Sequence, residues 1–154
     1  MPAALTIENL SVGYQRGKHQ QVLLKNLTLA LHPGKLVCFM GSNGIGKSTL
    51  IRTLAGLQPP LAGSISKTTA TDVALVLTDR ISAQHMTVDE LVAFGRYPYL
   101  NWSATITEAD GRILKEVVDL VHIRHLLGKR LYELSDGQLQ MAMIARALAQ
   151  HTPV

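Results

Sequence analysis

The glycine-rich segment Gly41–Thr49 (GSNGIGKST) constrains the fold of this 154-residue chain more than any other feature. It fits the pattern G-x-x-x-x-G-K-[ST], with an apolar run at Lys35–Met40 before it and a helix-favouring run at Lys47–Ala55 after it. A strand, a phosphate-binding loop and a helix in this order form a nucleotide-binding unit. The sequence therefore predicts a P-loop protein that binds a nucleoside triphosphate.

The residue types of this loop suit the chemistry of a triphosphate. Its glycines let consecutive backbone N–H groups turn inward around the β-phosphate, and the N-terminus of the following helix adds partial positive charge. Lys47 brings an ammonium to the β- and γ-phosphates, Ser48 offers a hydroxyl to Mg²⁺, and Thr49 can bond the α-phosphate. The predicted nucleotide-binding residues of the loop are Gly41, Ser42, Asn43, Gly44, Ile45, Gly46, Lys47, Ser48 and Thr49.

Composition narrows the class of protein. The apolar content of 47% is ordinary for a globular domain, and no apolar run approaches the length that crosses a bilayer. The segment Met1–Leu10 lacks the features of a signal peptide, so we expect a cytosolic protein. The single cysteine, Cys38, is expected to be buried in the apolar run before the loop. Basic residues are scattered despite a net charge of +4, which disfavours a nucleic-acid partner.

Strand patterns precede and follow the loop. Apolar residues alternate along Ala4–Leu10 and Val22–Leu31, as expected for strands with one buried face. Lys35–Met40 is apolar on both faces, which predicts a buried parallel strand. A second buried strand is predicted at Val73–Leu77 and a short strand at Gly63–Ser66.

Helical patterns dominate from residue 78 onward. Thr87 and Thr107 each begin a capping sequence with an acidic residue three positions later, which predicts two helix starts. In the second of these helices an apolar stripe is expected at Ile113, Val117, Leu120 and Val121.

A second motif, Leu134–Gln138 (LSDGQ), stands before the apolar helix predicted at Leu139–Ala149. Ser135 and Gln138 have the spacing of a capping box. Ser135 and the N–H of Gly137 would also lie at the positive end of that helix, where they could form a second anion site.

With this motif after a phosphate loop and a helical insert, the chain resembles the nucleotide-binding domain of ATP-binding-cassette (ABC) transporters, whose signature is LSGGQ. The resemblance implies an α/β fold: a P-loop NTPase core with an N-terminal antiparallel β subdomain and an inserted helical subdomain, incomplete in this chain. It divides the chain into an ATP-binding core (1–78), a helical subdomain (79–134) and the signature with its helix (135–154). Asp136 replaces a signature glycine, and we expect its carboxylate to point to solvent.

The same resemblance implies roles for individual residues and the cofactors ATP and Mg²⁺. Tyr14 stands where the family has an aromatic residue that stacks on adenine. The resemblance implies that Ser135, Gly137 and Gln138 act on the ATP held by a partner subunit, so that two subunits enclose two nucleotides head to tail. Thr78 stands where the family usually has a glutamine that reaches Mg²⁺, and it is expected to be a second Mg²⁺ ligand beside Ser48.

The segment Met86–Tyr99 resembles the helical insert of ABC subunits that import iron-siderophore, haem or cobalamin complexes. This resemblance implies that the chain is part of a peripheral ATPase subunit at the cytoplasmic face of the inner (cell) membrane. The implied partners are a second ATPase subunit, membrane permease subunits and, indirectly, a periplasmic or surface binding protein.

The chain ends at Val154, where the family would begin the strand with a Mg²⁺-binding Asp and the catalytic Glu. We therefore expect a segment truncated before that strand, which binds ATP and hydrolyses it little. Two alternatives stay open: a soluble ABC ATPase that acts on the ribosome or DNA, and a P-loop kinase of small molecules. Gly95–Trp102 disfavours the first alternative, and Leu134–Gln138 disfavours the second.

Overall fold

The computed structural model describes residues 3–66, 73–76, 85–103 and 105–152. The chain divides into two compact units, Met1–Val73 with Pro153–Val154, and Ala74–Thr152. No described helix is both long enough and apolar enough to cross a membrane.

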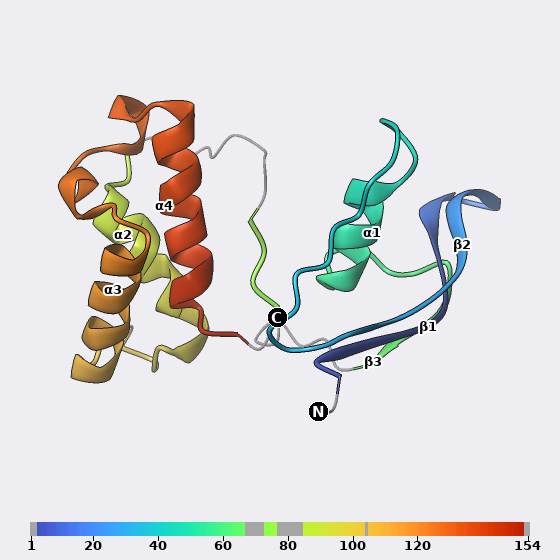
Figure 1. Cartoon of the computed structure of the whole chain (residues 1–154), viewed down its shortest axis with the longest axis horizontal. Helices are drawn as coiled ribbons and strands as arrows, with labels where there is room; N and C mark the ends of the chain where they lie inside the picture. The colour runs from blue at the N-terminus through green and yellow to red at the C-terminus, as the bar shows by residue number, and fades with distance from the viewer. Residues whose placement is uncertain (1–2, 67–72, 77–84, 104, 153–154) are drawn as a thin grey trace. The chain divides into compact units, whose positions relative to one another are not determined.

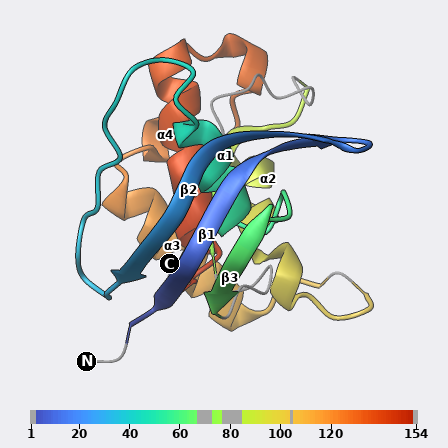
Figure 2. The same ribbon diagram turned by 90° about the vertical axis from the view of Figure 1, so that its right-hand side faces the viewer.

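The first unit is a three-stranded antiparallel sheet with one helix. Its strands are β1 (Leu5–Arg16), β2 (His19–Leu31) and β3 (Ala62–Ser66), in the order β2-β1-β3, and its helix is α1 (Lys47–Leu54) (Figure 2). Alternating apolar residues of β1 face inward and pack with α1 because a strand presents every second side chain to one face. The core residues are Leu5, Ile7, Leu10, Val12, Leu50 and Leu54. These elements confirm the strands predicted at Ala4–Leu10, Val22–Leu31 and Gly63–Ser66 and the helix predicted after the loop.

A tight turn fixes the register of the β1–β2 hairpin. Arg16 pairs with His19 across the turn, and Gly17 in the turn has a φ of 59°. Two-residue turns of this kind require positive φ, which glycine adopts without strain. Farther along, Gly13 pairs with Val22, and a Cβ atom on Gly13 would lie 2.0 Å from the carbonyl oxygen of Gln21. The hairpin therefore has no room for a side chain at this position.

The parallel strands predicted on either side of α1 are absent from the described residues. Residues 35–40 have no regular structure, and Leu36 and Met40 are each 91% exposed. Cys38 is exposed rather than buried. Residues 73–76 are also irregular, and Leu77 lies outside the described residues. An apolar strand is buried on both faces only when neighbouring strands and covering helices surround it, and none of the described strands pairs with these segments.

The second unit is helical. It contains α2 (Val88–Ala93), α3 (Glu108–Leu120), α4 (Asp136–Ala149) and the 3₁₀ helices η1 (Phe94–Tyr99), η2 (Arg124–Leu126) and η3 (Leu131–Glu133) (Figure 1). Thr87, Thr107 and Ser135 form the predicted capping boxes at the starts of α2, α3 and α4. The predicted helix starts are confirmed because a cap depends on residues only three positions apart.

Helices α2 and α3 pack against α4 around an apolar core. Val117, Val118 and Val121 are buried in this core, and Ile113 packs at its edge. The predicted stripe was wrong at Leu120, which is 65% exposed. The buried face of α3 is centred on Val117 and Val118, so it turns Leu120 outward.

A buried ion pair joins three of these helices. Arg96 Nε lies 2.8 Å from Asp110 Oδ1, and Arg96 Nη1 donates to the carbonyl oxygen of Ala149 at 3.0 Å. The guanidinium carbon also lies 4.2 Å from the centre of the Tyr99 ring. Hydrogen bonds from the hydroxyl and backbone N–H of Thr107, with one from Arg96, lower the pKa of Asp110 to about 2. The carboxylate is therefore ionised at neutral pH and can cap α3 while it holds Arg96.

Candidate nucleotide site

The predicted phosphate loop has the backbone geometry of an anion site. Gly44 and Gly46 have φ values of 82° and 111°, in the region that favours glycine. Gly46 is the N-cap of α1 and supplies no side-chain cap. The first N–H groups of α1 are therefore available to an anion, and the helix dipole favours negative charge there.

Lys47 lies over this loop. Its Nζ donates hydrogen bonds to the carbonyl oxygens of Gly41 and Ser42, each at 2.7 Å. These two carbonyls hold the ammonium beside the loop without neutralising its charge. A phosphate oxygen carries a full charge and can compete for the same ammonium protons.

A cavity of about 410 Å³ opens in front of the loop. This volume lies in the ordinary range for small-molecule sites. Its lining combines one cation, three hydroxyls and backbone N–H groups, and none of the described residues that line it carries a carboxylate. The lining residues are Tyr14, Gln21, Leu23, Asn43, Gly44, Gly46, Lys47, Ser48 and Thr49.

Tyr14 links the β1–β2 hairpin to helix α1. Its hydroxyl lies 3.1 Å from the hydroxyl oxygen of Thr49, at hydrogen-bond distance, and the residue is 47% exposed. Thr49 is buried, and its carbonyl accepts a hydrogen bond from Thr53. The ring therefore has a fixed anchor and an open face, as a platform for a flat ligand requires.

The structure brings most of the predicted loop residues to this cavity. Gly41 and Ser42 contribute through the carbonyls that bind Lys47, whereas Ile45 packs its side chain toward Gly41 and does not line the cavity. Ser48 is exposed, and its hydroxyl fits a hard cation such as Mg²⁺. Thr78, the second predicted Mg²⁺ ligand, lies outside the described residues.

The signature residues lie at the start of α4 in the second unit. Ser135 Oγ accepts a hydrogen bond from the N–H of Gln138 at 3.3 Å, and the Ser135 N–H donates to Gln138 Oε1 at 3.0 Å. The Ser135 hydroxyl keeps its own proton for another acceptor. A Cβ atom on Gly137 would have no described atom within 4 Å outside its own helix and its chain neighbours, and Asp136 is exposed. Of the groups in this capping box, the hydroxyl proton of Ser135 is therefore left for a ligand.

The sequence interpretation missed Gln21, which lines the cavity beside Tyr14. The two residues are direct partners in the β1–β2 ladder. A signal was present in the sequence, because a two-residue turn at Gly17 and Lys18 sets which residues face each other. The register would have placed Gln21 opposite Tyr14.

Known proteins resemble this chain over nearly its whole length. The sequence model of a family described as "ABC transporter" matches residues 24–154. An uncharacterized ABC transporter ATP-binding protein of Methanocaldococcus jannaschii is 39% identical over 161 aligned residues, which cover 97% of this chain and 54% of that protein. The ferric enterobactin transport ATP-binding protein of Escherichia coli K12 is 34% identical, with coverage of 99% and 59%.

A solved structure gives the same result in three dimensions. A transporter assigned to the metal-chelate type of ABC transporter, in an inward-facing conformation, matches with a TM-score of 0.81 and 30% identity. The match covers 98% of this chain and 57% of that one. The chain thus spans little more than half the length of the relatives it matches.

Proposed function

This chain belongs to the ABC transporter family, and from that premise we propose that it forms the ATP-binding part of an importer subunit. The observation that carries the proposal is the loop cavity, in which Lys47 and the uncapped start of α1 face the same space. Together they provide the positive charge and N–H donors that a triphosphate requires.

Within this proposal each loop residue has a distinct role. Lys47 exchanges its two carbonyl partners for oxygens of the β- and γ-phosphates, and the N–H groups of the loop bind the β-phosphate. The Ser48 hydroxyl would hold Mg²⁺, with Thr78 as the proposed second ligand. When bound, Mg²⁺ would offset part of the negative charge of the phosphates.

We further propose that the described residues bind ATP without supplying a general base. This proposal is supported by the lining of the loop cavity, in which no described residue carries a carboxylate. Transfer of the γ-phosphoryl group to water needs a residue that orients the water. The 154-residue chain should therefore release phosphate far more slowly than it exchanges bound ATP, which a phosphate-release assay on Mg-ATP measures.

The proposed second half of the site is the start of α4 in a partner subunit. Ser135, Gly137 and Gln138 would contact the γ-phosphate held by the other copy. The capping box occupies the N–H groups of Ser135 and Gln138 and leaves the Ser135 hydroxyl proton as a donor, and the Gly137 N–H lies in the first turn of α4, where the helix dipole favours an anion. ATP would then hold two copies together. Head-to-tail association of this kind should depend on nucleotide.

Sedimentation of the full chain with and without Mg-ATP tests this association. The Ser135→Ala variant should lose most of the ATP-dependent dimer. Thr107→Ala is the matched control, because it removes the equivalent cap from α3 and leaves the signature intact. Equal dimer formation by Ser135→Ala and the wild type would contradict the role in trans.

The proposed cargo is cobalamin or an iron complex, the latter with a siderophore or as haem. A membrane permease would carry this cargo, and the subunit would be bound to the cytoplasmic face of that permease. Relatives named for ferric enterobactin and siderophore transport support this choice. Exposed rings on and after η1 support a protein-binding role for that segment: Phe94 and Tyr97 stack at 5.3 Å, and Trp102 is fully exposed.

Uptake by cells tests the cargo. In cells whose only suitable ATPase subunit is the protein that contains this chain, Lys47→Ala should abolish uptake of a labelled ferric siderophore. A loss of cobalamin uptake with normal siderophore uptake would assign the other cargo.

A further inference from the structure

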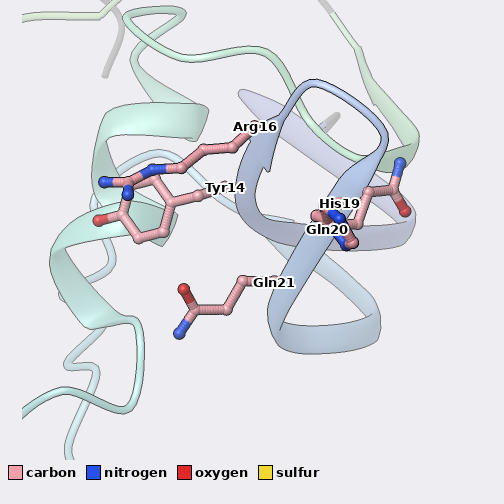
Figure 3. Close-up of a pocket in the computed structure, with 5 residues that line it drawn as sticks. All are labelled: Tyr14, Arg16, His19, Gln20 and Gln21. Carbon is pink, nitrogen blue, oxygen red and sulfur yellow. The ribbon is translucent and has the colours of Figure 1, made fainter.

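A second cavity adjoins the loop cavity on the β1–β2 hairpin. Its volume is about 370 Å³, and it is lined by Tyr14, Arg16, His19, Gln20 and Gln21 (Figure 3). Tyr14 and Gln21 line both cavities. They therefore mark the junction between the space in front of the phosphate loop and the space on the hairpin.

The hairpin register explains why these two side chains share a face. Tyr14 and Gln21 are direct partners across the antiparallel ladder, and such partners point to the same side of a sheet. Figure 3 shows the side chains of Tyr14, Arg16 and Gln21 extending toward the side on which the coil of α1 lies, whereas the Gln20 amide points away from it. The alternation along β2 accounts for this difference between neighbours.

Two features fix Gln21 in place. The hydrogen bond between the Tyr14 and Thr49 hydroxyls ties the hairpin face to α1. The lack of a side chain at Gly13 lets the backbone carbonyl of Gln21 lie against β1. The Gln21 amide thus projects from a well-defined backbone position at the cavity junction.

The parts of a nucleoside triphosphate follow the same order as the loop cavity, the junction and the hairpin cavity. Its phosphates occupy one end, its base the other, and the ribose lies between them. With the phosphates at Lys47 and the base in the hairpin cavity beside Tyr14, the ribose falls at the junction. We propose that the Gln21 side-chain amide hydrogen-bonds the ribose hydroxyls and makes the site selective for ribonucleotides; this assignment rests on the proposed ATP binding.

The chemistry of Gln21 suits this role. A side-chain amide carries both N–H donors and a carbonyl acceptor, so it can pair with hydroxyls that donate and accept. The side chain is exposed. Its replacement should leave the fold unchanged, because no buried contact is lost.

Equilibrium binding by the full 154-residue chain tests the assignment, with ATP, 2′,3′-dideoxy-ATP and inorganic tripolyphosphate as probes. The wild type should bind ATP about fivefold more tightly than the dideoxy analogue, as one or two neutral hydrogen bonds allow. Gln21→Ala and Gln21→Leu should abolish this preference, and both should keep the wild-type affinity for tripolyphosphate. Gln15→Ala is the matched control: Gln15 lies on the same hairpin but lines neither cavity.

The outcomes separate this inference from the function on which it rests. If ATP binds but the Gln21 variants keep the preference, or if the wild type has none, the ribose assignment is overturned while ATP binding stands. If neither ATP nor tripolyphosphate binds the wild type, the phosphate site itself fails, and the ribose assignment fails with it.

Discussion

At the scale of single residues, the Tyr14 side chain combines two separable contributions. Its ring offers an open face to a base, and its hydroxyl bonds Thr49 at 3.1 Å. Tyr14→Phe keeps the ring, so ATP affinity should fall by no more than about threefold. Tyr14→Ala removes the stacking surface and should weaken ATP binding by about tenfold or more. Titration of both variants with ATP measures the difference; equal losses would show that the hydroxyl, not the ring, is the important group.

The ionisation of Asp110 makes a second prediction. Its pKa is lowered to about 2 in the folded chain, so the stabilisation it provides is present above the ordinary carboxyl pKa near 4 and is lost as the pH falls toward 2. Asp110→Asn removes the charge that faces Arg96 and should lower the melting temperature at pH 7. The gap between variant and wild type should shrink as the pH falls from about 4 to 2. Thermal unfolding followed at several pH values checks this, and a gap that is constant with pH would contradict it.

At the scale of elements, the contact between η1 and α4 depends on a missing side chain. A Cβ atom on Gly95 would lie 2.3 Å from the Arg146 carbonyl oxygen and 2.9 Å from the Ala149 Cβ. Gly95→Ala should therefore force the two helices apart and destabilise the chain by about 1–3 kcal/mol. Chemical unfolding followed by circular dichroism measures this change.

Gly111 provides the matched comparison. It lies inside α3, and among the described residues a Cβ atom there would have no contact within 4 Å beyond its own helix and its chain neighbours. Gly111→Ala should stabilise the chain by up to about 1 kcal/mol, because alanine has the higher helix propensity. Destabilisation by Gly111→Ala as large as that by Gly95→Ala would show that the close packing at η1 is not the cause.

The elements also show what the sequence could predict. The starts of α2, α3 and α4 were predicted correctly because Thr87, Thr107 and Ser135 bond to residues three positions away. The strand predicted at residues 35–40 was wrong because an apolar run becomes a buried strand only beside other strands. Local caps are encoded in neighbouring residues, whereas burial of a parallel strand depends on distant ones.

The candidate site, like the helices and strands, was predicted where it depends on neighbouring residues and missed where it depends on distant ones. The loop residues that face the cavity follow from a continuous motif, so their positions needed no tertiary information. Gln21 was missed because its place opposite Tyr14 depends on the register of the hairpin.

At the scale of the whole molecule, all the described residues that line the two cavities belong to the first unit. A ligand stabilises the parts of a protein that bind it. In a dilute, monomeric sample, Mg-ATP should slow hydrogen exchange in the β1–β2 hairpin and α1 and leave α3 unchanged. Exchange measured by mass spectrometry tests this distribution, and uniform protection of both units would contradict it.

The central claim is that the loop around Lys47 binds ATP. Isothermal titration of the full 154-residue chain with Mg-ATP tests it most directly. The wild type should bind one ATP per chain, and Lys47→Ala should weaken binding by about 10- to 100-fold, the usual effect of losing a charged hydrogen-bond partner. Lys25→Ala is the control, because Lys25 is exposed on β2 and does not line the cavity. Equal ATP affinity in the wild type and Lys47→Ala would contradict the claim.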